Sequence, residues 1–310
     1  MTYRILLLTA MLATPALAGE SARSTYSPGS SLDFGAGLTP PVDGLFLRED
    51  FWYFDGDLDG SIFGGAVTAQ AHLKAMVATT RLFWYPGWTL MNARYGAFLS
   101  IALADSEVSS KITTRTPGGQ ENVLEQNGTR TGFSDLYVTP LSLGWKKGNW
   151  HYKWTETLTL PVADYSTSEV LNLGRNYVSL NSSIGITYRE GNEGLEFNLR
   201  TGFIVNDENP DTNYRTGNEV YADGSLTWRF TPAFTAGLTG SAYRQVTGDS
   251  GEGAVFGDFE GRVYAAGPVF RYFLETRSGR LVLIAKWLHQ FESEYHFEGD
   301  TFMVSLVTKL

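Results

Sequence analysis

The sequence predicts an all-β protein, specifically a transmembrane up-and-down antiparallel β-barrel of about twelve strands. Residues 219–230, EVYADGSLTWRF, alternate apolar or small residues with polar ones, as a strand with one oily and one polar face does. The connections between such stretches alternate between long and short, which is typical of outer-membrane barrels. After the amino-terminal segment, no apolar run of about 18 residues is present, so only strands are available to cross a membrane.

The chain begins with a segment typical of a secretory signal peptide. It contains one basic residue, Arg4, then an apolar run over residues 5–12 and the small-residue motif Ala16-Leu17-Ala18. This pattern predicts that residues 1–18 are a signal peptide cleaved after Ala18. The chain has no cysteine, which excludes a disulfide framework and suits the envelope of a Gram-negative bacterium. We therefore expect a location in the bacterial outer membrane.

Residues 19–43, GESARSTYSPGSSLDFGAGLTPPVD, are rich in Ser, Gly and Pro and precede the first strand. This composition favours a flexible leader, with the Pro40-Pro41 pair stiffening the entry to the barrel. A leader of this length is also able to fold back into the lumen as a plug, and both interpretations stay open. Residues 44–310 are then the barrel itself.

Twelve runs have strand character, and no segment after residue 18 has a convincing helical period. We expect the short turns on the periplasmic side, the long loops outside the cell, and both termini on the periplasmic side. The last run, TFMVSLVTKL, ends at the last residue, so it is placed to close against the first. The runs are 44–54, 66–85, 90–105, 134–145, 150–161, 177–189, 194–205, 218–230, 234–246, 261–276, 280–291 and 300–310.

Aromatic residues gather beside the short turns, as in the runs that include Trp84, Trp88, Trp150 and Trp228. Amphipathic rings are favoured where hydrocarbon meets lipid headgroups, so these residues predict the periplasmic aromatic girdle. It follows that the oily face of each strand points to lipid and the charged face lines the lumen.

Charged side chains on the lipid side of the wall cost roughly 2–4 kcal/mol each near the midplane, so we expect them inside. Arg48 and Lys74 are placed inward on this argument, and Arg200 and Asp223, on neighbouring strands, are predicted to pair. The basic excess favours phenolate or carboxylate solutes, and inward Tyr177 and Tyr221 offer flat surfaces to aromatic rings. The candidate lumen and solute-binding residues are Arg94, Glu196, Arg200, Tyr221, Asp223, Arg229, Arg271 and Lys286.

Motifs that suggest chemistry are few. GDSGEG at 248–253 begins like a serine-protease signature, but that chemistry needs a positioned histidine, and the four histidines, His72, His151, His289 and His296, lack the expected context. DGDLDG at 55–60 begins like a calcium loop, but the twelfth position is Ala66 where a glutamate is required. We therefore predict no catalytic residue, metal or cofactor, while calcium binding completed by other loops stays open.

Two alternatives to a channel remain. One is a closed structural or adhesive barrel, braced inside by its own ion pairs. The other is a lipid-modifying enzyme with a serine–histidine pair on the lipid-facing wall. His72 is predicted to face the lumen, which disfavours the enzyme, whereas His289 shares the outward parity of Trp287. The net charge of −9 and the lack of a basic cluster exclude a nucleic-acid partner.

The order of motifs over residues 40–310 resembles a family of outer-membrane proteins of the "MetA-pathway of phenol degradation", or SphA-like transporters. The resemblance implies an outer-membrane barrel that takes up small hydrophobic or aromatic compounds, surrounded by outer-membrane lipids and inserted by the barrel-assembly machinery. One departure is the last residue, Leu310, where barrel proteins commonly end on an aromatic. The motifs are PPVDGLFLREDFWYFDGD, GFSDLYVTPLSLGWKKGNWHY, LPVADY, NLGRNY, NPDTNYRTGNE, RQVTGDSGEG, GRVYAAGPVFRY and EGDTFMVSLVTKL.

Overall fold

The computed structural model describes residues 20, 24–30, 34–62, 65–116, 118–255, 257–277 and 279–310. The predicted signal peptide and its cleavage site lie outside these residues. Among the described residues, no helix combines the length and the apolar character that crossing a membrane requires.

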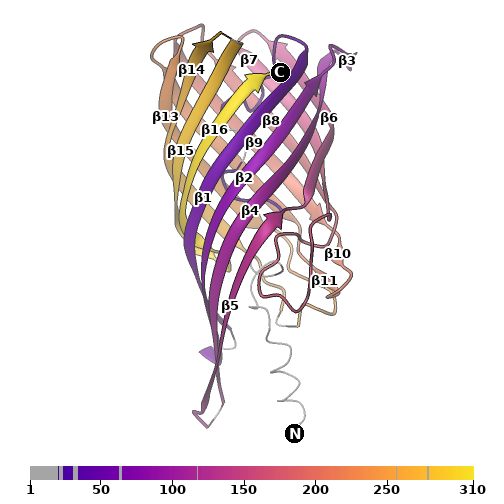
Figure 1. Cartoon of the computed structure of the whole chain (residues 1–310), viewed down its shortest axis with the longest axis vertical. Helices are drawn as coiled ribbons and strands as arrows, with labels where there is room; N and C mark the ends of the chain where they lie inside the picture. The colour runs from indigo at the N-terminus through magenta and orange to yellow at the C-terminus, as the bar shows by residue number, and fades with distance from the viewer. Residues whose placement is uncertain are drawn as a thin grey trace.

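Twelve antiparallel strands close into a barrel, which confirms the predicted fold class (Figure 1). The last strand pairs with the first, from Phe46 opposite Lys309 to Asp57 opposite Glu298, and this seam completes the wall. The barrel strands are β1 (Gly44–Ile62), β2 (Val67–Tyr85), β4 (Ala93–Arg115), β6 (Leu136–Lys147), β7 (Trp150–Leu160), β8 (Ser179–Arg189), β9 (Gly194–Asn206), β12 (Glu219–Arg229), β13 (Phe234–Gln245), β14 (Arg262–Thr276), β15 (Gly279–Glu294) and β16 (Glu298–Lys309).

The two ends of the barrel differ as predicted. Short turns such as 86–88, 148–149 and 230–233 lie at one end, together with the start of β1 and the end of β16 (Figure 1). Exposed and half-buried aromatic rings pack against one another there, with ring centroids 5.3 Å apart for Trp84 and Trp88 and 5.0 Å apart for Trp150 and Tyr188. We call this the short-turn end and the opposite one the long-loop end.

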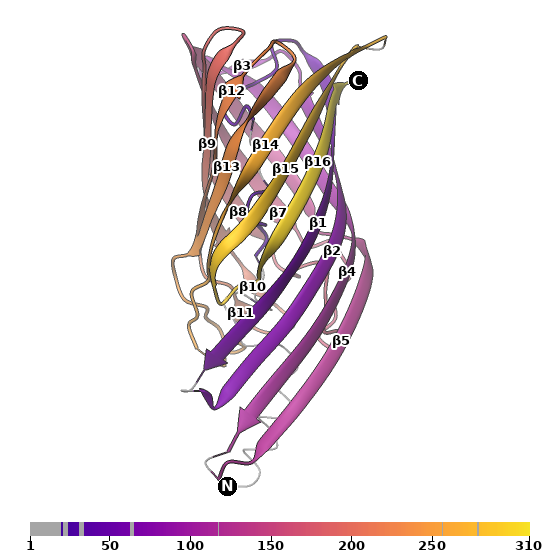
Figure 2. The same cartoon turned by 90° about the vertical axis from the view of Figure 1, so that its left-hand side faces the viewer.

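The segment 106–133, expected to be a long loop, is a β-hairpin instead. β4 continues to Arg115, and β5 (Glu121–Phe133) pairs with its outer half. Together with the extended β1 and β2, these strands project beyond the rest of the barrel at the long-loop end (Figure 2). The DGDLDG stretch lies within β1 and is therefore part of this projection, not a loop. Three short strands complete the fold: β3 (Thr89–Leu90), β10 (Glu208–Asn209) and β11 (Tyr214–Arg215).

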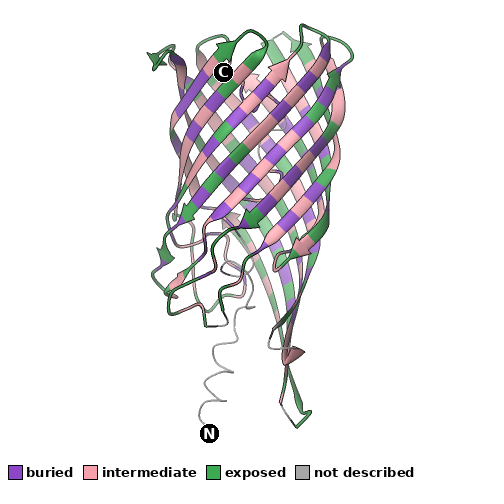
Figure 3. Ribbon diagram, turned by 180° about the vertical axis from the view of Figure 1, so that it is seen from behind, coloured by how far each residue is buried: buried purple, intermediate pink, exposed green. Residues whose placement is uncertain are grey.

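The polarity of the two faces reverses in this projection. In the body of the barrel, apolar side chains such as Phe51 and Met76 are exposed on the outside, whereas Arg48 is buried inside. Beyond the body, the inner face buries Leu58, Ala71, Leu73 and Val108, which pack against Leu171 and Phe297 from the loops. Figure 3 shows the alternation of buried and exposed residues along the strands. The oily face therefore marks the lipid side only where lipid is present.

This reversal corrects the predicted inward positions of His72 and Lys74. His72 lies on the outer face, with its Nδ1 2.7 Å from Asp57 Oδ1, and Lys74 Nζ lies 4.0 Å from Asp55 Oδ2 on the same face. The sequence analysis predicts that both face the lumen because it expects polar side chains inside along the whole strand. Leu73 instead belongs to the apolar inner face of the projection.

Trypsin added to intact cells is expected to cut after Arg115, because Arg115 is exposed and residues 118–120, at the tip of the β4–β5 hairpin, are exposed as well. Arg277, in the turn at the short-turn end, is the internal comparison and is expected to be spared. Fragment masses after gel separation locate the cut, and Arg115→Gln should abolish it. Cleavage at Arg277 with the hairpin intact would show that the barrel has the opposite orientation.

Candidate functional site in the barrel lumen

The described residues of the leader, 20, 24–30 and 34–43, are distributed lengthwise along the lumen. The carboxyl end of the leader joins β1 at the short-turn end, whereas Glu20 lies at the long-loop end, where its carboxylate accepts hydrogen bonds from Asn209 at 2.7 Å and Thr212 at 2.8 Å. The chain between them contacts the inner wall along the way, at residues 24–30 and 34–38. This path differs from the expectation that both ends of the mature chain lie on the periplasmic side.

Glycine allows the leader to lie flat against the wall. The backbone N–H groups of Gly35 and Gly37 donate to Asn198 Oδ1 at 2.8 Å and to Thr187 Oγ1 at 2.9 Å. A Cβ atom at Gly185 of β8 would lie 2.0 Å from the carbonyl oxygen of Ala36, so no other residue fits at that position without displacing the leader.

Two aromatic side chains of the leader are buried against the wall. Phe34 packs with Val269 and Ile284, and the guanidinium of Arg271 lies 4.5 Å from the centre of its ring. Tyr26 is stacked on Tyr221 in a second apolar cluster. The leader is thereby anchored at two points along the lumen as well as at Glu20.

A buried ion cluster spans the lumen near the short-turn end. Arg271 makes a bidentate contact with Glu196, with its two terminal nitrogens 3.0 and 2.9 Å from the carboxylate oxygens, and Arg189 Nε lies 3.6 Å from the same carboxylate. Glu196 is fully buried. Arg229 is 1% exposed and lies nearby, two positions beyond Thr227, which is the cross-strand partner of Glu196. Arg271 and Arg189 therefore share one buried carboxylate, which ties β9 to β14 across the interior.

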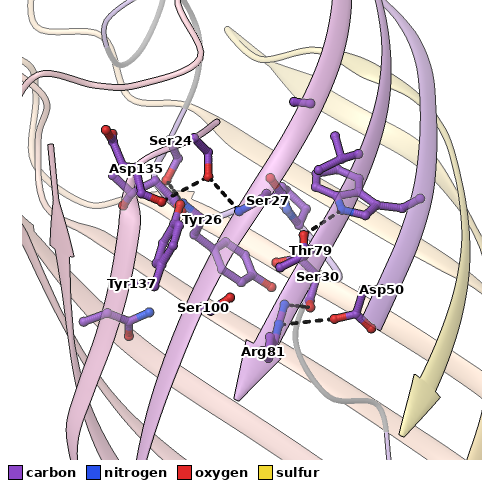
Figure 4. Close-up of a pocket in the computed structure, with 18 of the residues that line it drawn as sticks. Ser24, Tyr26, Ser27, Ser30, Asp50, Thr79, Arg81, Ser100, Asp135 and Tyr137 are labelled. Atoms are coloured by element: carbon purple, nitrogen blue, oxygen red, sulfur yellow. Dashed lines mark hydrogen bonds and ion pairs between the residues drawn. The ribbon is translucent and has the colours of Figure 1, made fainter. Parts of the chain in front are cut away.

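A cavity of about 320 Å³ remains between the leader and the wall, with most of the wall side chains supplied by β1, β2, β4, β6 and β7 and others by β8, β9, β12, β15 and β16. Part of its surface is apolar and aromatic, with side chains that include Trp52, Phe54, Leu73, Phe83, Phe98 and Met303. Polar groups face the rest. Arg81 donates to the Ser30 carbonyl at 3.3 Å and its Nε lies 3.2 Å from Asp50, as Figure 4 shows. Lys153 and Arg200 also line the cavity, and Lys153 donates to the Leu38 carbonyl at 3.2 Å.

Asp135 anchors a long loop beside this cavity. It lies between β5 and β6, is 3% exposed, and accepts the backbone N–H groups of Ala163 and Arg175 at 3.3 and 2.7 Å. Burial raises the pKa of the Asp135 carboxyl above its usual value, while these hydrogen bonds act in the opposite direction. The loop of residues 161–178 is thus fixed at the long-loop end of the cavity.

Among the predicted site residues, Arg200 and Tyr221 line the cavity directly. Lys286 donates to the carbonyl of Gly29 in the leader, and Asp223 accepts from Tyr26. Glu196, Arg271 and Arg229 belong to the buried ion cluster described above. Arg94 lies at the short-turn rim, where it pairs with Asp43. The eight residues are therefore divided among four places: the cavity, the contacts with the leader, the ion cluster and the short-turn rim.

The predicted pairing of Arg200 with Asp223 has the required register, because the two residues lie directly opposite each other on β9 and β12. The hydrogen bonds of the two side chains run to other groups. Arg200 donates to Ser183 at 3.1 and 3.3 Å, and Asp223 receives the hydroxyl of Tyr26. The leader supplies a partner that strand parity alone does not reveal.

Sequence reasoning missed Arg81, Lys153 and Asp50, which face the cavity. Arg81 has the opposite parity to Lys74 on β2, so the predicted inward position of Lys74 does not lead to Arg81. The signal that identifies Arg81 is its shared parity with Thr79 and Phe83, which also line the cavity.

Outside the lumen, the described residues contain no group of three or more His, Asp, Glu or Cys side chains arranged to hold a metal ion. The aspartates of DGDLDG contact strand partners, with Asp59 accepting from Gln70 at 2.9 Å. His289 does face outward, with its Nδ1 3.1 Å from Asp300 Oδ1. Its cross-strand neighbours are Ala266 and Asp300, so neither supplies the serine that the lipid-modifying alternative needs.

The structure is similar to that of an outer membrane channel from Pseudomonas putida F1, with a TM-score of 0.67 and 14% identity over 90% of this chain and 100% of that chain. This likeness shows the fold. The translocator domain of the autotransporter NalP from Neisseria meningitidis (TM-score 0.44, 12% identity, 88% of this chain and 91% of that chain covered) and a FadL homologue of Pseudomonas aeruginosa (TM-score 0.36, 8% identity, 85% and 87% covered) are more distant.

No curated protein matches the sequence. Residues 57–306 match the model of a family described as "Putative MetA-pathway of phenol degradation". The matched range includes β2 and every barrel strand from β4 to β15, together with the loops between these strands. The chain belongs to this family.

Proposed function

We propose that the protein is a channel of the bacterial outer membrane, exported with cleavage after Ala18, that takes up small hydrophobic or aromatic compounds. The observation that carries this proposal is the cavity of about 320 Å³ inside the barrel. Ligand sites of this size are mostly apolar with a few placed polar groups, and this one combines aromatic rings with guanidinium and ammonium groups.

The lining of the cavity favours a ring that carries a negative group. Its ionisable side chains include the bases Arg81, Lys153, Arg175 and Arg200 against the acids Asp50 and Asp135. Guanidinium groups bind carboxylates and lie flat on aromatic faces, and Trp52, Phe83 and Phe98 offer an apolar surface to the ring. An aromatic carboxylate or phenolate satisfies both parts of the lining.

Replacing Lys153 and Arg200 together with glutamine is expected to shift the selectivity of the channel toward cations and to slow benzoate uptake about tenfold. Charged side chains focus counter-ions in a low-dielectric passage, so their removal lowers the local concentration of the anion. Reversal potentials in planar bilayers and uptake by a deletion strain measure the two effects. The matched control is Arg94→Gln at the rim, and unchanged selectivity in a heat-modifiable double variant would contradict the proposal.

The alternative of a closed structural barrel has one observation in its favour, the tight fit of the leader inside the lumen. The same flux measurement separates the two functions, since a structural barrel changes neither conductance nor uptake. In the channel proposal the leader is the plug, and its displacement precedes passage of the solute.

A further inference from the structure

Tyr26 of the leader occupies a slot on the inner wall. Its ring stacks on Tyr221, with centroids 4.0 Å apart and an interplanar angle of 13°, and lies 6.3 Å from the ring of Tyr243. Its hydroxyl donates to Asp223 Oδ2 at 2.5 Å. Tyr26 itself is 7% exposed, so a single side chain of the leader is enclosed in a site made almost entirely of wall residues.

The side chains that form this slot around Tyr26 belong to the barrel wall. Tyr221 and Tyr243 are cross-strand partners on β12 and β13, and Ile204 and Val263 complete the apolar cluster. Gly202 lies opposite Tyr221 on β9, and a Cβ there would lie 2.4 Å from Tyr221 Cε1. The glycine lets the ring of Tyr221 lie flat on the wall and present its free face to the lumen.

We propose that this slot is a binding site for neutral phenols and that Tyr26 is its built-in occupant. A tyrosine side chain is a phenol with an alkyl group opposite the hydroxyl. A free phenol therefore reproduces the stacking on Tyr221 and the hydrogen bond to Asp223. Tyr26 and Tyr221 both line the cavity, so a solute in the cavity is already beside the slot. The proposal rests on the proposed function only in taking such a solute to reach the lumen.

Displacement of Tyr26 would weaken the hold of the leader on the wall. Around Tyr26, the chain is tied through the Thr25 carbonyl to Tyr137 at 2.9 Å and through Ser24 to Glu219. The backbone N–H of Gly29 also donates to the Tyr26 hydroxyl at 3.2 Å. A phenol that replaces the Tyr26 side chain in the slot removes both the stacking on Tyr221 and the hydrogen bond from Gly29. Binding of the solute thus weakens the attachment of the leader to the wall.

The acceptor defines the chemical class of the ligand. The carboxylate of Asp223 accepts a hydrogen bond, and the hydroxyl of phenol supplies the donor. Anisole has a methyl group in place of the hydroxyl hydrogen and therefore cannot donate. A phenolate lacks the donor as well and is repelled by the carboxylate. This site therefore selects un-ionised phenols, whereas the basic lining of the cavity favours anions, and the two can be tested separately.

The test is phenol binding to the purified full-length protein in detergent, measured by titration calorimetry, with Tyr26→Ala as the variant. Tyr26 is tethered, so it competes at a high effective concentration, and its removal is expected to tighten phenol binding about tenfold or more. In Tyr26→Ala, phenol should bind about tenfold more tightly than anisole, because a hydrogen bond to a charged acceptor is among the stronger ones. Tyr26→Phe, which loses only the hydroxyl, should show a smaller gain.

Phe34→Ala is the matched control, since it opens a space of similar shape beside Arg271, where the nearby carboxylate, Glu196, already accepts hydrogen bonds from both terminal nitrogens of that guanidinium. It is expected to show no preference for phenol over anisole. Equal phenol affinity in the wild type and in both Tyr26 variants, or equal affinity of Tyr26→Ala for phenol and anisole, would overturn the inference. The assay measures binding alone, so a protein that binds phenol in this pattern but transports none would refute the proposed function and leave the site in place.

Discussion

Deletion of residues 20–38 is expected to raise the single-channel conductance of the barrel severalfold in planar bilayers. A barrel of twelve strands has a lumen only slightly wider than wall side chains can fill, so one extended segment inside it blocks most of the passage. The described leader residues occupy that space and bond to the wall from Glu20 to Leu38. Their removal leaves a continuous aqueous path.

A leader of unchanged length with residues 24–30 replaced by Gly and Ser is the control for this deletion. It keeps the chain in the lumen but loses the anchor at Tyr26, so we expect a flickering conductance between the closed and the fully open level. Conductance in the deletion variant equal to that of the wild type, in a heat-modifiable barrel, would show that the leader is not what closes the lumen.

The barrel was predictable because each of its constraints is local. A strand between lipid and an aqueous or polar interior must alternate with period two, and the difference between loops and turns repeats with every hairpin. The β4–β5 hairpin was not predictable in this way. Its sequence from Ser106 to Phe133 is polar and rich in Ser, Thr and Asn, which is typical of a loop, but outside the membrane such residues form strands whose outer face contacts water.

The candidate site was predictable only in part. Inward parity identified Glu196, Asp223 and Arg271 correctly as buried lumen residues. Their partners come from far along the chain, as in the contact between Tyr26 and Asp223, and no local pattern encodes such a contact. The composition of the leader is compatible with a flexible segment and with a plug, and no sequence pattern indicates that the backbone N–H of Gly37 donates to Thr187 of the wall.

Glu196→Ala is expected to lower the free energy of unfolding by about 3–5 kcal/mol, because it leaves the buried guanidinium of Arg271 without its carboxylate. The side chain of Arg271 is 5% exposed and makes a bidentate contact with Glu196. Arg189, whose side chain is 32% exposed and whose Nε lies 3.6 Å from the same carboxylate, would lose a counter-ion as well. Guanidinium-induced unfolding in lipid vesicles, followed by tryptophan fluorescence, measures the change.

Glu121→Ala is the matched control, since Glu121 also pairs with an arginine, Arg115, at 2.7 Å but on the exposed hairpin. Exposed ion pairs contribute about 0–1 kcal/mol, so this variant should unfold nearly as the wild type does. A double variant, Glu196→Leu with Arg271→Leu, should recover part of the loss, because it removes one stranded cation together with the acid. Recovery should remain incomplete while Arg189 is still present. Equal effects of Glu196→Ala and Glu121→Ala would mean that water reaches the cluster and that the lumen is hydrated at this level even with the leader in place.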